Sequence, residues 1–135
     1  MPRSLLFLGT ESTRDRATRI GVARILVGAS MFQPIAVATH LSGIPDDESS
    51  GSVLFFARAF GIRNAVLGAW VLASRDRPKR YQRLVYRVNA AVDAADLAVM
   101  AISAIGHRVP KRLLALTALL GGNACLGFLE LASEV

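Results

Sequence analysis

The stretch LLALTALLGGNACLGFL, residues 113–129, decides the fold, because no charged residue interrupts it. Its length approaches the roughly 20 apolar residues that a helix needs to cross a bilayer. Three further blocks of similar character precede it, and short charged loops separate the blocks. We therefore predict an all-α fold, an integral membrane four-helix bundle that forms a single transmembrane domain over residues 1–135. The predicted spans are about 19–40, 53–74, 84–105 and 113–132.

A soluble helical bundle is the competing fold, and it would need a polar face about half the width of each helix. The chain does not provide such faces. Four stretches are apolar or small all the way round: 25–31, 65–73, 97–105 and 113–120. Four spans of roughly 20 residues also use most of the 135 residues. No room is left for a folded catalytic domain outside the membrane.

The charged residues lie mainly in the loops, and their signs predict an orientation. The chain carries 16 Lys and Arg against 10 Asp and Glu, a formal net charge of +6. Because the basic residues flank apolar blocks, we interpret them as membrane-flanking residues and expect no nucleic acid as a partner. The basic loop 75–83 and the arginines before the first span favour a bacterial inner membrane protein with both termini cytoplasmic. The three basic residues of loop 106–112 run against this bias.

The residues that usually carry enzyme or metal chemistry form no pattern in this chain. It contains no G-x-S-x-G, no H-E-x-x-H and no G-x-x-x-x-G-K-[ST] motif. One cysteine and two histidines cannot make a zinc cluster, and His40 is followed by the acids of loop 41–52 without regular ligand spacing. We expect a non-enzymatic protein with no cofactor and no metal site.

The N-terminal run Leu5–Leu8 is apolar but too short for the core of a signal peptide. No small-residue cleavage site follows it. We expect a tail that touches the membrane interface, with disorder as the alternative.

Ionisable residues occur inside the predicted spans, where each is costly without a partner or a role. Helical spacing places Asn89, Asp93 and Asp96 on one face of the third span. We expect Arg63 to pair with Asp93 or Asp96, and Arg58 to reach the nearer membrane interface. The full intramembrane charge network comprises Arg24, Arg58, Arg63, Asp93, Asp96 and Glu130, with Asn64, Asn89 and Asn123 as supporting polar residues.

This set of residues has two interpretations, and both stay open. The first is an internal network of salt bridges and hydrogen bonds that fixes the helix register. The second is a polar site for a proton, an ion or a lipid headgroup; the arginines favour a phosphate or carboxylate over a cation.

Small residues recur at helical spacing beside these polar positions. Such residues let helix backbones approach closely within lipid. We predict that each span presents one face of small or polar residues and that the four faces converge. The glycines assigned to helix packing are Gly21, Gly28, Gly61, Gly68 and Gly127.

The segment ARAFGIRNAVLG, residues 57–68, resembles a pattern in small four-helix proteins of actinobacteria. That pattern, A-R-x-F-G-x-R-[DN]-x-x-L-G, belongs to uncharacterised membrane families of the DUF4267-like type. Their third helix carries a D-x-x-D motif, which residues 93–96 match. Residues 24–28 are also similar to the opening of DoxX-like four-helix proteins. The resemblance implies a small actinobacterial inner-membrane protein, of a kind that accompanies larger envelope machines such as the Mce-type lipid importers of mycobacteria.

These observations lead to one expected function and one alternative. We expect an accessory subunit that packs against a larger envelope transport complex and stabilises or regulates it, plausibly a lipid transporter of the Mce type. Its partners would be the larger transporter subunits and membrane lipids. The alternative is an autonomous small transporter or lipid-binding homo-oligomer that uses the intramembrane Arg and Asp residues.

Overall fold

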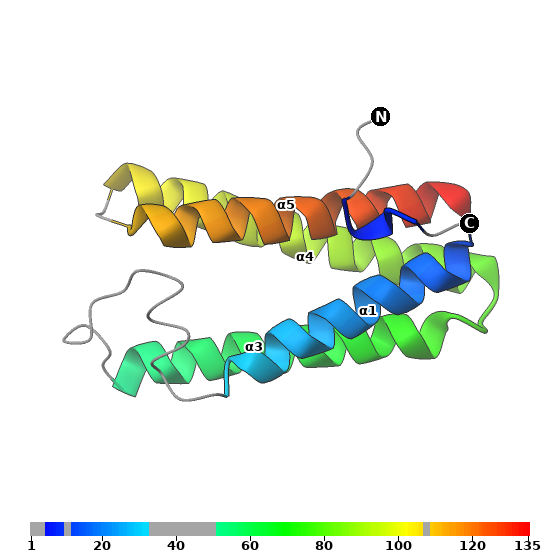
Figure 1. Ribbon diagram of the computed structural model, residues 1–135, viewed down its shortest axis with the longest axis horizontal. Coiled ribbons are helices and arrows are strands. Elements are labelled where there is room, and N and C mark those ends of the chain that lie inside the picture. Colours follow the sequence, from blue (N-terminus) through cyan, green and yellow to red (C-terminus); the bar gives the residue numbers. More distant parts are fainter. Residues whose placement is uncertain (1–4, 10–11, 33–50, 107–108) are drawn as a thin grey trace.

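The regular structure of the described chain is entirely helical (Figure 1). The computed structural model describes residues 5–9, 12–32, 51–106 and 109–135. A short 3-10 helix precedes four α-helices, and the predicted all-α class is confirmed. The elements are η1 (Leu5–Phe7), α1 (Thr13–Ser30), α3 (Gly51–Ser74), α4 (Lys79–Gly106) and α5 (Lys111–Glu134).

The helix α1 begins at Thr13, six residues before the start of the first predicted span at about residue 19. Ser12 is its N-cap, and the Ser12 hydroxyl accepts a hydrogen bond of 3.0 Å from the Asp15 amide. This cap satisfies a backbone donor that the first turn leaves free, and the Asp15 charge suits the helix N-terminus. Residues 33–40 of the predicted span lie outside the described residues.

The other predicted helices are observed, with longer boundaries. The helix α3 ends at Ser74 as predicted, whereas α4 begins five residues before the predicted start and α5 two residues before it. The α4 helix follows Pro78, whose carbonyl accepts hydrogen bonds from the Tyr81 and Gln82 amides. The fixed backbone angle of proline suits the start of a helix, so α4 begins among charged residues that hydropathy alone excluded.

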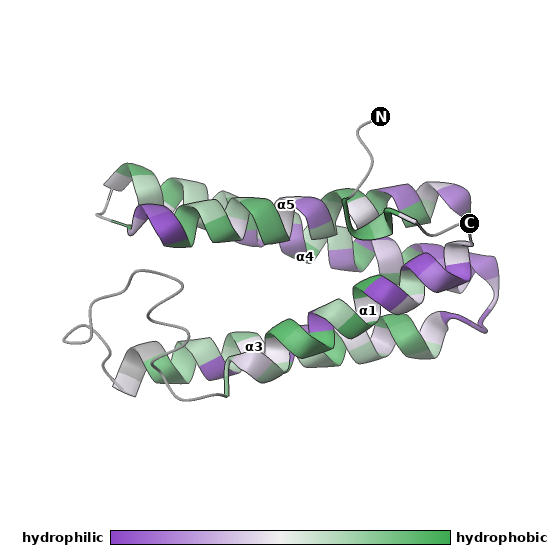
Figure 2. Ribbon diagram, viewed as in Figure 1, coloured by the Kyte–Doolittle hydropathy of each residue, from purple (hydrophilic) through white to green (hydrophobic). Residues whose placement is uncertain are grey.

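Three of the described helices are long and apolar enough to cross a membrane: α3 from Leu54 to Ser74, α4 and α5. The helix α1 is not among them, because five of its 18 residues are charged. Figure 2 shows hydrophilic residues gathered toward the α3–α4 turn and apolar residues over much of the remaining helix length. The charged residues of α1 are Arg14, Asp15, Arg16, Arg19 and Arg24.

The helices pack as two antiparallel pairs, α1 with α3 and α4 with α5. Contacts between the pairs are far fewer than contacts within them. Figure 1 shows the pairs close together near the α3–α4 turn and diverging away from it. The predicted convergence of all four faces of small or polar residues is observed only in part. The glycine faces of α1 and α3 meet directly, and Arg24 of the α1 face reaches Asp93 of the α4 face.

Glycine is required at the crossing of α1 and α3. A Cβ atom at Gly28 would lie 2.4 Å from the backbone oxygen of Gly61, and one at Gly68 would lie 2.6 Å from that of Gly21. These distances are far below van der Waals contact, so a side chain at either position would force the helices apart. The seven-residue spacing of the two glycines on each helix produces the two matching contacts. Gly127 is buried on α5.

The hydrophobic core lies where the two helix pairs approach each other. Tyr86 of α4 stacks on Phe128 of α5, with ring centroids 6.5 Å apart. Ile20 of α1 and Val71 of α3 are also fully buried, so every described α-helix contributes to this core. The core joins the two pairs at one end, whereas elsewhere many large apolar side chains remain exposed.

The N-terminal segment is folded against the bundle, which differs from the expected interfacial tail. Phe7 is buried, and the Leu5 amide donates to Oδ1 of Asn123 at 3.1 Å. Arg19 donates to the Leu6 and Leu8 carbonyls at 3.2 and 2.7 Å. These bonds and the buried Phe7 side chain hold η1 against α1 and α5.

Candidate functional site

The strongest polar contact between the helix pairs is a buried ion pair. Arg24 of α1 binds both carboxylate oxygens of Asp93 on α4, at 2.7 and 2.8 Å. The two side chains are only 5% and 7% exposed. The Arg24 guanidinium also lies over the Phe128 ring, 5.4 Å from its centroid. One hydrogen bond, from Nη1 to Oδ2, and a close charge contact between Nη2 and Oδ1 neutralise both charges and fix the register of α1 against α4.

A second ion pair joins α3 to α4. Arg63 binds Asp96, one of the two partners expected from the sequence. Its guanidinium lies over the Phe60 ring at 5.0 Å. In contrast to the first pair, these side chains are 41% and 31% exposed. Both residues lie near the middle of helices that are long and apolar enough to cross a membrane. Because both side chains remain partly exposed, the chain itself covers this pair only in part.

Glu130 pairs with a residue that the sequence argument left outside the network. Arg16 of α1 lies 3.3 Å from Glu130 and also binds Glu134. Arg16 was missed because the first helix was expected to begin at residue 19. Arg58 of α3 is exposed and forms no ion pair with any described residue. The expected single network is therefore three separate interhelical contacts.

The supporting asparagines have different roles. The Asn64 and Asn89 amides each donate to the carbonyl four residues earlier in the same helix, at 3.0 and 2.9 Å. Asn123 does the same at 2.8 Å and also accepts from the Leu5 amide. Oδ1 of Asn89 is buried and has no hydrogen-bond partner in the described chain. None of the three asparagines hydrogen-bonds to the described ion pairs.

The end of the molecule at the α3–α4 turn carries a second group of charges. Arg14 binds Asp76, which lowers the pKa of the Asp76 carboxyl and raises that of Arg14 through a hydrogen bond and charge attraction. Trp70 donates its indole N–H to the Tyr81 hydroxyl at 2.9 Å. Amphipathic rings of this kind gather at membrane interfaces.

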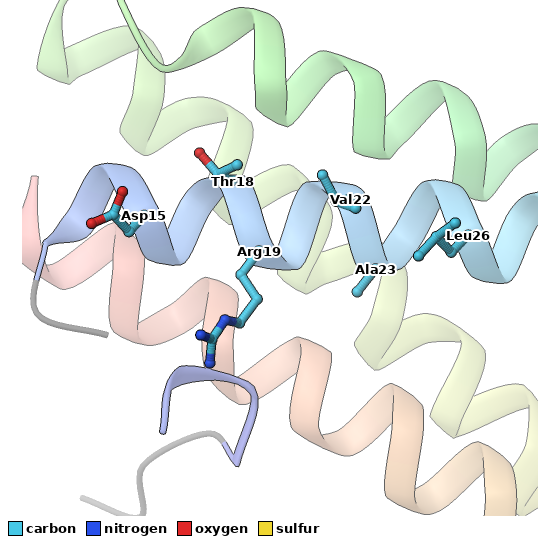
Figure 3. Close-up of a pocket in the computed structure, with 6 residues that line it drawn as sticks. All are labelled: Asp15, Thr18, Arg19, Val22, Ala23 and Leu26. Atoms are coloured by element: carbon cyan, nitrogen blue, oxygen red, sulfur yellow. The ribbon is translucent and has the colours of Figure 1, made fainter. Parts of the chain in front are cut away.

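An open depression runs along the exposed side of α1. Figure 3 shows its lining, with the Arg19 side chain extending toward η1. Its walls come from one helix alone and do not enclose a ligand, so this depression does not provide a catalytic site. The lining residues are Asp15, Thr18, Arg19, Val22, Ala23 and Leu26.

The polar groups of the described chain lie mainly in contacts between helices. Within residues 5–9, 12–32, 51–106 and 109–135, no group of three His, Cys, Asp or Glu side chains could hold a metal ion. Cys125 is partly buried, with its thiol 3.5 Å from the Ala90 carbonyl. The half-exposed pair Arg63–Asp96 is the feature most open to an outside group. His40 and the acids of loop 41–52 lie outside the described residues.

Comparison with known proteins gives no family assignment. No family model matches the chain, and no curated protein and no solved structure matches it. The function is therefore argued from the geometry of the chain itself.

Proposed function

We propose that this chain is a non-enzymatic accessory subunit that docks laterally onto a larger membrane protein and stabilises it. The observation that carries the proposal is the incomplete cover of Arg63 and Asp96. Their side chains are 41% and 31% exposed although both lie near the middle of membrane-length helices. A charged pair at this depth is unfavourable against lipid tails and becomes stable when protein or trapped water surrounds it.

The shape of the bundle supports a lateral partner. The two helix pairs diverge from their common core, and large apolar side chains are exposed along α3 and α4, including Ile62, Val66 and Val99. A partner helix placed against these residues would cover the Arg63–Asp96 pair and bury apolar surface. The contact would combine close packing with polar bonds, the two interactions that associate helices in lipid.

The setting of the proposed complex follows from charge and resemblance. The basic α3–α4 turn favours the cytoplasmic side of a bacterial inner membrane, with both termini on that side. The resemblance of residues 57–68 to the small actinobacterial families favours an envelope lipid transporter of the Mce type as the larger partner.

The test is affinity capture from native membranes in a mild detergent, with a tag on the chromosomal copy and mass spectrometry of the eluate. We expect a stoichiometric set of larger transporter subunits. The double variant Arg63→Met with Asp96→Leu removes both charges together and should reduce recovery of the partner at least tenfold. The matched control is Arg58→Met on the same helix, an exposed arginine without an ion pair to a described residue, which should retain the partner.

Two results would overturn the proposal. Recovery of the chain alone, as a monomer or small oligomer, would refute an accessory role and favour the autonomous carrier. Undiminished capture by the double variant would show that the partner binds another surface. Unchanged helix content and unchanged chain abundance in both variants establish that the comparison concerns binding and not folding.

A further inference from the structure

We propose that the outer face of α4 binds one anionic phospholipid, with the phosphate against a basic ladder and an acyl chain along an alanine track. The basic ladder is Arg80, Arg83 and Arg87. The alanine track is Ala91, Ala94, Ala98 and Ala101. This inference is independent of the partner complex, because it concerns the side of α4 that faces away from the other helices.

The basic ladder follows from helical spacing. Its three arginines stand at positions i, i+3 and i+7 of α4, and at about 100° per residue they fall within a sector of about 60°. All three side chains are exposed. The opposite side of α4 is buried in the core through Val85 and Asn89. The Arg80 and Arg87 side chains are therefore exposed on the outside of the bundle, about two turns apart, whereas Arg83 between them binds Val135 at the end of α5.

Two of these three charges, Arg80 and Arg87, are not paired within the chain that the structure describes. Three acids at this end bind other arginines, Asp76 with Arg14 and both Glu130 and Glu134 with Arg16, and the fourth described acid, Asp15, forms no ion pair with any described residue. Arg83 donates to the carbonyl of Val135. Arg80 and Arg87 form no ion pair with any described residue. Guanidinium groups bind phosphate oxygens in a bidentate fashion, so a phosphate group complements this ladder.

The depth of the ladder matches that of a lipid phosphate. The hydrogen-bonded rings of Trp70 and Tyr81 mark the interface, and Arg80 is adjacent to Tyr81 in α4. Arg87 lies six residues beyond Tyr81, about 9 Å deeper along the helix. Its long side chain can extend back toward the interface. All three arginines thus reach one layer, where anionic headgroups attract basic residues.

The alanine track continues the same face of α4 into the apolar layer. Its four members are exposed, and together with the arginines they lie within a sector of about 80°. From Arg87 to Ala98 the helix rises about 16 Å, roughly half of the 30 Å hydrocarbon core. Bulkier residues border the track, Val99 on one side and Leu97 on the side facing α5. The resulting shallow track has the length of one leaflet, as an acyl chain does.

A lipid fits this face better than another helix. A second copy of the chain packed in parallel along it would place arginines against arginines, which is repulsive. A different partner helix would need an acid opposite each arginine at the interface. One phosphate satisfies several guanidinium groups at once, and its acyl chain covers the alanines.

The test is native mass spectrometry of the full chain in detergent, with added phosphatidylglycerol or phosphatidylcholine as the probe. We expect the chain to prefer phosphatidylglycerol, and excess inorganic phosphate not to displace it. Each arginine near the interface is worth about fivefold in affinity, so Arg80→Gln with Arg87→Gln should weaken phosphatidylglycerol binding about 25-fold. Binding of phosphatidylcholine should stay unchanged. Replacing both arginines by lysine should give an intermediate loss, because the charge remains and the bidentate geometry does not.

The matched control removes the same charge at the other end of the bundle, Arg58→Gln with Arg112→Gln. It should leave phosphatidylglycerol binding within twofold. An equal loss in this control would reduce the effect to net charge and overturn the site, as would full binding by the Arg80 and Arg87 variant.

Ala94→Leu with Ala98→Leu fills the track and should also weaken binding. If it instead releases a co-purified protein and leaves lipid binding intact, the face binds a protein and the proposal is wrong.

Discussion

Replacing Gly28 by alanine is expected to push α1 and α3 apart at their point of closest approach. The new Cβ would lie 2.4 Å from the Gly61 oxygen and 2.8 Å from the Ala65 amide nitrogen. Ordinary contact begins at 3.4 Å, so the Gly61 oxygen must retreat by about 1 Å (3.4 minus 2.4). Both opposing atoms belong to the backbone of α3, and no flexible side chain can move aside to make room.

The magnitude follows from two opposing effects. Overpacking of a tight contact lowers stability by about 1–3 kcal/mol, and a backbone contact belongs at the upper end of that range. Alanine in place of glycine recovers up to about 1 kcal/mol of helix propensity. We therefore expect Gly28→Ala to lower the free energy of unfolding by about 2 kcal/mol. Gly122 of α5 has no atom within 4 Å of its added Cβ, so Gly122→Ala should raise stability by up to about 1 kcal/mol.

The assay is reversible unfolding of the purified chain in mixed micelles, followed by circular dichroism, for both single variants and for Gly28→Ala with Gly61→Ala. The double variant should lose less than the sum of its parts by at least about 0.5 kcal/mol, because one separation of the helices relieves both clashes. If Gly28→Ala is neutral or stabilising like Gly122→Ala, the helices do not touch at these glycines and the reasoning is refuted.

Two further predictions concern the ion pairs. Asp93→Leu leaves the buried Arg24 charge without its acid and should lower stability by about 3–5 kcal/mol, whereas Arg24→Met with Asp93→Leu should recover most of that loss; unfolding in mixed micelles compares the two. The exposed Arg14–Asp76 pair depresses the pKa of Asp76 below its ordinary 3.8, so its small contribution is complete above that pH and is lost as the pH falls through the lower folded value. The stability difference between the wild-type chain and Asp76→Asn should therefore shrink below about pH 4, and a difference that grows there would contradict this assignment.

The sequence allowed part of the candidate site to be predicted. Charge balance inside apolar helices led us to expect Arg63 to pair with Asp93 or Asp96, and the structure selected Asp96. The partner of Glu130 was missed, because Arg16 lies before the expected start of the helix and only the Ser12 cap brings it into α1. The Ser12-x-x-Asp15 spacing was a readable signal for that earlier start.

The sequence by itself determined the helical class, because uninterrupted apolar stretches such as 113–129 leave the backbone no partner in lipid except its own helix. It also determined which residues must find partners, since a charge at membrane depth is unfavourable alone. Only the tertiary structure decided how the helices pair. Each helix carries small and polar residues at similar spacing, so many pairings satisfy the pattern. The backbone contact of Gly28 with Gly61 selects α1 with α3, and the divergence of the two pairs leaves Arg63 and Asp96 half covered while Arg24 and Asp93 are buried.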